Sequence, residues 1–330
     1  MVSPRIVISH WDDVEGVRRE QGHIAGTWQS LTGSSSVTVG VRRIRIDPGK
    51  WATPLHLEGS EEEIFYVLAG TGVSVQDGGD GLRAYAVRPG DCLVHLALEH
   101  AHTLLAGPDG LDVLAFGHRH YAANTLLPRA GVSWLGPTWV LEGAPEDHPW
   151  AREAAAGPPE VPEPTERPGR ITNVDEVGEF ERIGATVARR GRDLGRAAGS
   201  ERTGIRVYDV LPGKLMNAPH SHSADEEIFV VLEGSGTVEL WPHPRAATDP
   251  ERWPGGHERH AVRAGHTIAS PAGRGCPLSI QAGAEGMRVL AYGTREPNDI
   301  AYYPRSGKVI LRGVGVIGRI EPLDYWDGED

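Results

Sequence analysis

Two histidines and a glutamate in the second half of the chain have the types and spacing of metal ligands. In PHSHSADEEIFVVLEG, His220 and His222 are two residues apart, and Glu227 follows after a short turn. Because residues two apart on a β-strand point to the same face, the two imidazoles would project together. Two histidines and one carboxylate that converge on one point form a facial triad, which leaves coordination positions open.

The same pattern occurs in the first half of the chain, with one change. PLHLEGSEEEIFYVLAG places His56 and Glu63 at the positions of the first histidine and the glutamate when the sequence is shifted by 164 residues. Between them, Glu58 stands where the second copy has His222. Burying carboxylates is costly unless they are paired or bind a metal. The acids therefore indicate a related site of different ligand composition.

These motifs belong to an internal repeat that fills nearly the whole chain. Without a gap, VGVRRIRIDPGKWATPLHLEGSEEEIFYVLAGTG lies over TGIRVYDVLPGKLMNAPHSHSADEEIFVVLEGSG. The second copy then has about eleven extra residues and, further on, one more, after which LAFG at 114–117 matches LAYG at 290–293. The repeat predicts two homologous domains, residues 1–142 and 170–330.

Residues 143–169 separate the two copies. Seven prolines fall between positions 145 and 168, and few side chains in this segment could form a core. We interpret the segment as an extended, semi-rigid linker.

Inside each copy the local pattern is that of β-structure. VTVGVRRIRI and RTGIRVYDV alternate and are rich in β-branched residues, whereas EIFYVLAG and EEIFVVLEG are short apolar runs that end at glycine. Turn residues recur at intervals of roughly ten residues, as in an all-β sandwich or barrel. Helix signals are weak, so we predict an all-β fold.

The overall composition narrows the class of protein. The chain has 330 residues, 39% of them hydrophobic, and a net charge of −12. This acidic balance argues against a nucleic acid or an anionic membrane as a partner. The partner that we expect is a small-molecule substrate. The two cysteines lack the spacing of a zinc site, and the N-terminus has no apolar stretch typical of a signal peptide. We therefore expect a cytoplasmic protein.

The spacing H-x-H-x4-E-x6-G resembles the signature of the cupin superfamily. In the first copy it is followed by RPGDCLVHLALEHAHTLLAG, which places His102 at the position of the final cupin ligand. The resemblance covers both halves and implies a bicupin, with two tandem jelly-roll (double-stranded β-helix) domains and a proline-rich linker. TREPNDIAYYPRSGK and LDYWDGED resemble a group of bacterial bicupins of unassigned role.

A typical cupin site holds Fe, Mn, Zn, Ni or Cu with three histidines and one glutamate. The resemblance implies two ligand sets: His56, Glu58, Glu63 and His102 in the first copy, and His220, His222 and Glu227 in the second. Both depart from the family pattern, because the first has a glutamate for a histidine and the second has Leu278 at the last ligand position. A shifted loop could bring Cys276 to that position. The implied cofactor is a divalent Fe, Mn or Zn ion.

The leading hypothesis is a mononuclear Fe(II)- or Mn(II)-dependent dioxygenase that acts on a small chelating organic substrate. Metal-dependent decarboxylation or isomerisation is the alternative reaction. Glu58 is then a fourth ligand or a general base, or it marks a site that is losing its function. A second hypothesis is a non-catalytic bicupin that binds a metal or a small ligand. A third is a scaffold protein that dimerises through its outer sheets, and a homodimer stays open in each case.

Several other polar side chains near the motifs have structural interpretations. Glu62 and Glu226 have the opposite parity to the ligand glutamates, so we expect them to face solvent or to pair with an arginine. His95 is expected to be a loop residue or a satisfied core histidine. Arg42 and its counterpart Arg206 are expected to form structural salt bridges, with a clamp for a substrate carboxylate as the alternative.

Overall fold

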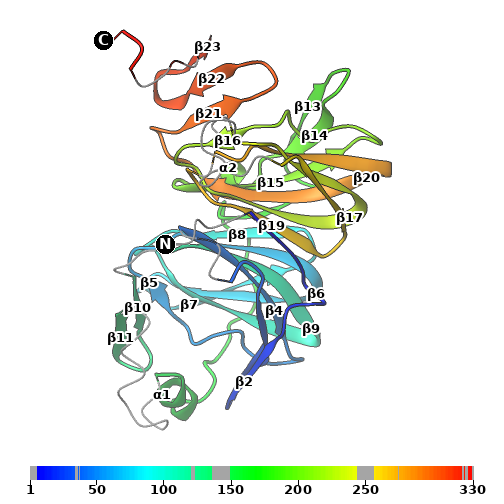
Figure 1. Ribbon diagram of the computed structural model, residues 1–330. Coiled ribbons are helices and arrows are strands. Elements are labelled where there is room, and N and C mark those ends of the chain that lie inside the picture. Colours follow the sequence, from blue (N-terminus) through cyan, green and yellow to red (C-terminus); the bar gives the residue numbers. More distant parts are fainter. Residues whose placement is uncertain are drawn as a thin grey trace.

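The computed structural model describes residues 6–33, 36, 38–119, 123–135, 149–243, 256–273, 275–321, 323 and 326–328. Two β-barrels, one from each half of the sequence, lie against each other (Figure 1). Each barrel is built around an eight-stranded sheet. The all-β fold with two tandem jelly-roll domains is therefore confirmed. The first residues of the predicted linker, 143–148, lie outside the described residues.

The first barrel is formed mainly by the N-terminal copy. Its strands are β2 (Val17–Gln21), β3 (Ile24–Ser30), β4 (Val39–Ile46), β6 (Glu63–Asp77), β7 (Leu82–Val87), β8 (Asp91–His95) and β9 (Ala101–His118), joined by β12 (Ile171–Asn173). The sheet order is β12-β8-β6-β9-β4-β3-β2, with β7 paired to β6. A separate small sheet contains β5 (Leu57–Glu58), β10 (Asn124–Leu127) and β11 (Val132–Leu135).

The second barrel repeats this arrangement. Its strands are β13 (Glu179–Ile183), β14 (Ala188–Arg192), β15 (Thr203–Val210), β17 (Glu227–Leu240), β18 (Glu258–Arg263), β19 (His266–Ser270) and β20 (Leu278–Thr294), joined by β1 (Val7–His10). Beside it lies a sheet of β16 (Ser221–His222), β21 (Ile300–Tyr303), β22 (Lys308–Leu311) and β23 (Val316–Arg319). The described residues include the helices α1 (Pro149–Ala155) and α2 (Leu194–Ala197) and a 3-10 turn at Arg312–Val314.

A glycine shared by the two repeats bends the long central strands. Gly70 in β6 has a φ of 81°, and Gly234 in β17 has a φ of 78°. A Cβ atom at these positions would lie 2.2 Å from the carbonyl oxygen of Gly110 and 2.4 Å from that of Gly286, respectively. Only glycine combines this backbone conformation with so close an approach.

The two domains exchange their first strands. β1 pairs antiparallel with β19 of the second barrel, and β12 pairs antiparallel with β8 of the first. Both β8 and β19 lie at the contact between the barrels (Figure 1). Each sheet is thus completed by a strand from the start of the other copy. The domain boundaries that the repeat indicates, 1–142 and 170–330, remain a prediction from the sequence.

The described part of the predicted linker contributes to the first barrel. In α1, the ring of Trp150 lies 5.8 Å from that of Trp28, between centroids, and both side chains belong to the apolar core. Glu153 is 1% exposed and forms an ion pair with Arg129. The segment is therefore not extended throughout, because its first turns pack on the barrel.

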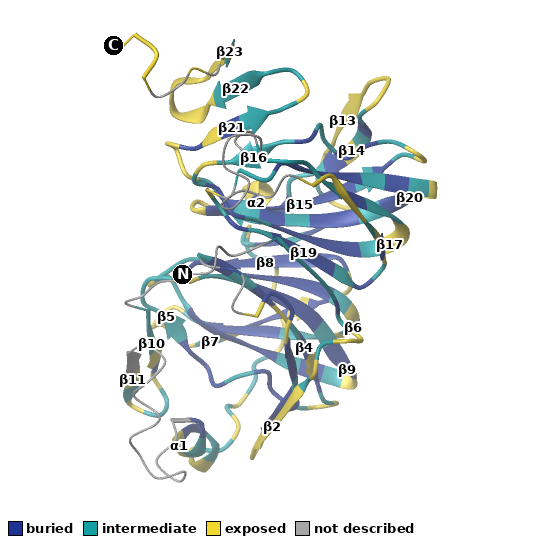
Figure 2. Ribbon diagram, in the orientation of Figure 1, coloured by how far each residue is buried: buried dark blue, intermediate teal, exposed yellow. Residues whose placement is uncertain are grey.

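A further apolar cluster fills the contact between the barrels. In β6, Phe65 points into the first barrel, whereas its neighbour Ile64 belongs to the cluster between the domains. Across this contact, the rings of Phe116 and Tyr292 lie 4.8 Å apart. In Figure 2, buried residues occur along the strands of both barrels and also where the two barrels meet.

Glu62 lies in this contact and not in solvent. Its side chain is 2% exposed and binds the loop before β15 of the second domain. The carboxylate accepts hydrogen bonds from Ser200 Oγ (2.8 Å), Glu201 N (2.9 Å), Thr203 N (3.0 Å), Arg202 N (3.3 Å) and Thr203 Oγ1. The expectation that Glu62 faces solvent is wrong, because the other domain covers the side to which this residue points, directly before β6.

Glu226 makes the reciprocal contact. It is 0% exposed, and its carboxylate accepts hydrogen bonds from Ser36 Oγ (2.7 Å), Thr38 N (2.7 Å) and Thr38 Oγ1 (2.6 Å) of the first domain. Ser36 and Ser200 are equivalent in the repeat. Glu62 and Glu226, called here the interdomain glutamates, therefore hold the two barrels together by equivalent contacts.

We predict that Glu62→Ala destabilises the folded protein by on the order of 3 kcal/mol, because it leaves buried donors of the second domain without their acceptor. The measurement is the urea unfolding curve, followed by tryptophan fluorescence. Glu285→Ala removes an exposed acid and serves as the control. An unchanged unfolding midpoint in Glu62→Ala would show that the loop donors find other acceptors.

The same contact predicts a loss of stability in acid. Burial raises the pKa of Glu62, but hydrogen bonds from Thr203, Glu201 and Ser200 outweigh it and hold the pKa below its ordinary value of 4.5. The folded state then binds this proton less tightly than the unfolded state. The stabilisation by Glu62 is complete above about pH 4.5 and is lost as the pH falls further. In a plot of the free energy of unfolding against pH, Glu62→Gln should therefore flatten the acidic part of the curve.

Candidate functional site

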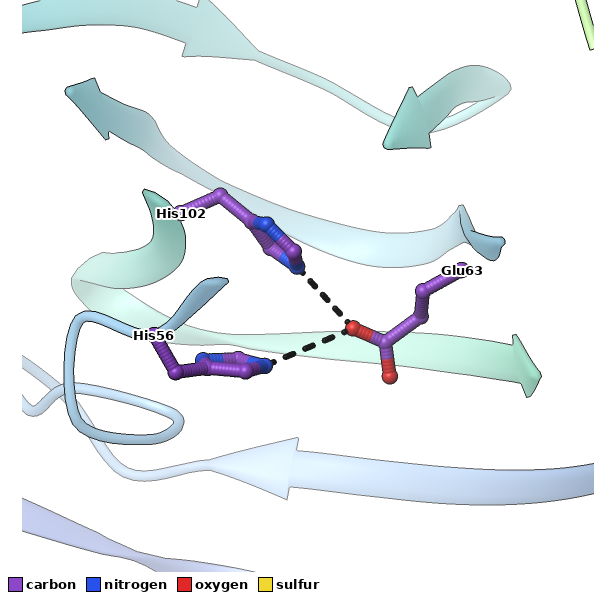
Figure 3. Close-up of side chains that lie close together, drawn as sticks. All are labelled: His56, Glu63 and His102. Atoms are coloured by element: carbon purple, nitrogen blue, oxygen red, sulfur yellow. Dashed lines mark hydrogen bonds and ion pairs between the residues drawn. The ribbon is translucent and has the colours of Figure 1, made fainter. Parts of the chain in front are cut away.

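His56, Glu63 and His102 converge inside the first barrel, with their polar atoms directed at one another (Figure 3). Glu63 Oε2 lies 3.0 Å from His102 Nε2 and 3.7 Å from His56 Nε2. All three donor atoms lie within 4.8 Å of one another. Glu63 opens β6, while a backbone bridge joins the two histidines, with His102 N donating to His56 O at 2.8 Å. We call these three residues the first cluster.

The far nitrogens of the two rings fix their orientation. His56 Nδ1 lies 2.9 Å from the carbonyl oxygen of Pro54, and His102 Nδ1 lies 3.3 Å from that of His100. With protons on both Nδ1 atoms, each Nε2 presents a lone pair towards the carboxylate of Glu63. Three acceptors that face one another require a proton or a cation between them, so this donor set fits a metal ion.

Glu58 lies beside the first cluster. Its Oε1 is 3.5 Å from His56 Nε2, and its Oε2 accepts a hydrogen bond from Thr125 Oγ1 at 3.0 Å. It is not one of the three mutually close donors. Burial raises the pKa of Glu58, partly offset by the charge of His56. A carboxyl group with one fixed oxygen and a raised pKa suits a general base, and the two roles predicted from sequence, ligand and base, both remain predictions.

His95 supports the ring of His102 from behind. The two rings are stacked, with centroids 3.7 Å apart and an angle of 3° between their planes. His95 is 5% exposed, and burial lowers its pKa well below the ordinary value, which keeps it neutral. It is a core histidine, as expected, and the sequence did not reveal that it positions a ligand candidate.

Protons balance the acids of the first cluster when no cation is bound. Burial disfavours the charged form of His56, but Glu63 and Glu58 raise its pKa to about 9. Burial also disfavours the charged form of Glu63, yet His102 and His56 hold its pKa well below the ordinary value. At neutral pH, His56 therefore carries a proton that a metal ion has to displace.

We predict that metal uptake by the first cluster releases protons and strengthens as the pH rises. Since His56 loses a proton with a pKa of about 9, the apparent association constant should rise by up to about tenfold per pH unit below that value. Calorimetric titration of Zn(II) into chelator-treated His220→Ala protein, in buffers of different ionisation enthalpy, measures both effects. Affinity that does not change with pH, without proton release, would contradict this assignment.

His220, His222 and Glu227 form the equivalent second cluster. Glu227 Oε2 lies 3.4 Å from His222 Nε2 and 3.9 Å from His220 Nε2. The three donor atoms again lie within 4.8 Å of one another. His222 Nε2 is buried and makes no well-formed hydrogen bond. Because buried polar atoms are normally satisfied, this nitrogen also fits a metal ligand.

Leu278 occupies the place that His102 has in the first barrel. His220 N donates to Leu278 O at 3.2 Å, and Leu278 N donates to His220 O at 3.0 Å. The same reciprocal bridge joins His56 to His102. The backbone therefore agrees with the sequence alignment, and an apolar side chain closes this ligand position. Cys276 is not among the clustered donors.

Asp299 is a functional candidate that the sequence did not reveal. It is 1% exposed, and its Oδ2 lies 2.7 Å from His222 Nδ1. Its Oδ1 accepts hydrogen bonds from Ala224 N at 3.0 Å and Asp225 N at 3.1 Å. A carboxylate on the far nitrogen of a ligand histidine fixes the ring and makes it a better donor to a metal. The only available signal was its position within the TREPNDIAYYPRSGK resemblance.

The two repeats differ in the residue at the second ligand position, Glu58 or His222, and also in the residue that hydrogen-bonds to it. With a shift of 176 residues, Ala123 in the first copy matches Asp299 in the second. His222 has the acceptor that it needs in Asp299, whereas Glu58 has the donor that it needs in Thr125. The histidine thus has a hydrogen-bond acceptor and the glutamate has a hydrogen-bond donor. This pairing favours a functional site at Glu58 over a site that is losing its function.

We predict that Asp299→Asn weakens metal binding by the second cluster by roughly 10- to 100-fold, because His222 loses a charged acceptor. The measurement is a Zn(II) titration of chelator-treated protein in a His102→Ala background. Asp175→Asn, at a largely exposed acid, is the matched control. Equal affinity in the two variants would show that Asp299 does not support a ligand.

A cavity of about 480 Å³ opens over the first cluster. Its lining includes His56, Glu58, Glu63, Arg19, Arg42, Arg119, Phe65, Trp28 and Trp150. Both its size and its mixture of aromatic and charged walls are typical of a small-molecule site. Trp150 comes from α1, so the segment predicted to be a linker forms part of this wall.

Comparison with known proteins gives a match in structure only. No protein-family model matches the sequence, and no curated protein matches it. The oxalate decarboxylase of Bacillus subtilis at pH 4.6 superposes with a TM-score of 0.56 at 15% identity, covering 86% of this chain and 75% of that chain. A deletion mutant of the same enzyme gives 0.57 at 16% identity, with 86% and 76% covered. A structure on substrate binding and reaction specificity in oxalate decarboxylase gives 0.57 at 16% identity, with 88% and 77% covered.

The chain has a bicupin fold. This confirms the architecture that the sequence resemblance implied, and the two His/Glu clusters are candidate sites for a divalent metal ion within it. At such low identity the likeness extends to the fold and carries no reaction or substrate. In the described part of the chain, no helix combines the length and the apolar character needed to cross a membrane.

Proposed function

We propose that this bicupin is a metal-dependent enzyme whose first cluster acts on a small chelating organic substrate, with dioxygenation as its reaction. The observation that carries the proposal is the convergence of His56, Glu63 and His102, of which His56 and Glu63 line a cavity of about 480 Å³. The second cluster would hold a structural or weaker metal, because Leu278 closes its last ligand position.

The first cluster offers two imidazoles and one carboxylate, a donor set suited to Fe(II), Mn(II) or Zn(II). Three protein ligands would leave about three positions of a six-coordinate ion for other molecules. When bound, Fe(II) or Mn(II) would supply the Lewis acidity and the redox chemistry of the reaction.

The surrounding residues would control protons and water. Glu58 Oε1 faces the cluster at 3.5 Å from His56 Nε2, while Thr125 fixes the other oxygen. Glu58 can therefore take a proton from a substrate hydroxyl or return one to a product. The aromatic walls Phe65, Trp28 and Trp150 would exclude water from the substrate.

The charge around the cluster favours dioxygenation. Glu58 replaces a neutral histidine, which lowers the net positive charge near the ion and stabilises its oxidised state. Decarboxylation is the second candidate, since proteins of the same fold at the quoted similarities are oxalate decarboxylases. Glu58 could deliver the proton that replaces carbon dioxide in that reaction.

We predict that metal content and oxygen uptake depend on the first cluster. Protein purified without chelators should contain Fe or Mn, and His102→Ala should lose the metal of the first site together with oxygen uptake, because the ligand set is broken. His220→Ala should lower metal content and retain oxygen uptake. Elemental analysis and an oxygen electrode, with catechols, gentisate-like acids and β-diketones as substrates, measure the two quantities.

The outcomes separate the proposals. His260→Ala, at an exposed histidine, controls for the loss of a surface imidazole. Absence of metal from the wild type, or metal content that neither cluster variant lowers, would contradict an enzyme of this kind. Release of carbon dioxide from oxalate or another dicarboxylate without oxygen uptake would replace dioxygenation by decarboxylation.

A further inference from the structure

Arg42 is an exposed residue that lines the cavity, in the row of positions next to the first cluster. Along β4, β9 and β6, Arg42, Ala115 and Phe65 are cross-strand neighbours. Phe65 points into the barrel and is two residues from Glu63, and successive inward positions on a strand are about 7 Å apart. Arg42 therefore borders the cavity one row away from the candidate ligands.

The counterpart in the second barrel is tied down. Arg206 lies in the equivalent row with Ala291 and Phe229. Its Nε donates a hydrogen bond to Asp193 Oδ2 at 2.8 Å. The structural salt bridge expected from the sequence is therefore confirmed for Arg206.

Arg42 has no such partner. Ser30 pairs with Arg42 across β3 and β4, and it stands in the first copy where the second has Asp193, the residue after Arg192 of the equivalent strand pair. An uncharged residue therefore replaces the aspartate. Among the described residues, none forms an ion pair or a hydrogen bond with the guanidinium group of Arg42. The described part of the chain therefore does not form the expected salt bridge at Arg42, and the guanidinium group lines the cavity.

A second arginine at this cavity also lacks an acidic partner among the described residues. The guanidinium of Arg19 lies 5.7 Å from the ring centroid of Trp28 and 5.5 Å from that of Trp150. Burial and the nearby charge of Arg42 lower the pKa of Arg19. Two like charges around a concave surface repel each other, and an anion between them would relieve the repulsion.

The charges of the whole lining lead to the same conclusion. The lining contains three arginines and three glutamates: Arg19, Arg42, Arg119, Glu58, Glu61 and Glu63. With neutral histidines these charges cancel. A divalent ion in the first cluster would leave an excess of two positive charges, which a ligand with two anionic groups would balance.

We propose that Arg42 binds a second anionic group of the substrate, so that the substrate is an organic acid with a chelating end at the first cluster and a carboxylate or similar group at Arg42. The apolar body between these ends would lie against Phe65, Trp28 and Trp150. This inference rests on the proposed function and narrows its substrate class. Arg42 is thereby a specificity-determining residue in contact with substrate.

Two related probes test the inference. Salicylate and 4-hydroxyisophthalate share a chelating hydroxy acid, and only 4-hydroxyisophthalate has a second carboxylate across the ring. Calorimetry on Zn(II)-loaded His220→Ala protein should show at least about tenfold tighter binding of 4-hydroxyisophthalate, because a charge-assisted bidentate contact is added. Arg42→Gln should abolish this preference, and Arg42→Lys should retain part of it.

The matched control is Arg45→Gln, which removes an exposed arginine from the other face of the same strand and should keep the full preference. Equal affinity of the wild type for the two probes, or an unchanged preference in Arg42→Gln, would overturn the inference. Metal content of the same samples tests the proposed function separately. If no metal is taken up, the proposed function is wrong. Arg42 is then tested in metal-free protein, by comparing the preference for isophthalate over benzoate between the wild type and Arg42→Gln.

Discussion

The first part of β6, from Ile64 to Val67, is buried on both faces, and the rest of the structure depends on this constraint. At its start Glu63 points into the barrel, while Glu62, the residue directly before the strand, points into the contact with the second domain. Because side chains alternate along a strand, a slip of one residue would exchange the two faces. It would send the ligand candidate into the interface and the interdomain glutamate into the cavity. Domain docking and ligand geometry are therefore fixed by one register, and the second barrel repeats the arrangement through Glu226 and Glu227.

The interface has kept its two-fold correspondence, whereas the two clusters have diverged. Each interdomain glutamate binds the equivalent loop of the other domain, and each domain lends its first strand to the other sheet. A change on one side of such a contact must be matched by a partner on the other, so the contact resists divergence. The clusters lie in separate barrels and are free of this requirement. The first cluster can therefore have Glu58 in place of a histidine, and the second can have Leu278 in place of a histidine, without a change in the contact between the domains.

The sequence was informative where the chemistry is local. The spacing of His220 and His222 and the register of the repeat were enough to bring the ligand candidates together and to place Leu278 at the last position. Alternation also assigned Glu62 to the opposite face correctly, but it could not say that a second domain covers that face. The contact from Asp299 to His222 spans 77 residues, and Trp150 reaches the cavity from a proline-rich segment. Such contacts depend on how distant segments pack, which no local pattern contains.

Two independent differences between the barrels assign the reactive site to the first. In the second barrel, Leu278 closes the last ligand position and Asp193 neutralises Arg206, so a metal there would meet an apolar wall and a charge already paired. In the first, His102 completes the cluster, and Arg42 forms no ion pair with an acid among the described residues. Arg42 is exposed, so water can solvate its charge while the cavity is empty. A ligand that fills the cavity displaces this water, and an anionic group on the ligand would then pair with the guanidinium group. Arg42 and His102 would then serve the two ends of one ligand, with the aromatic walls between them.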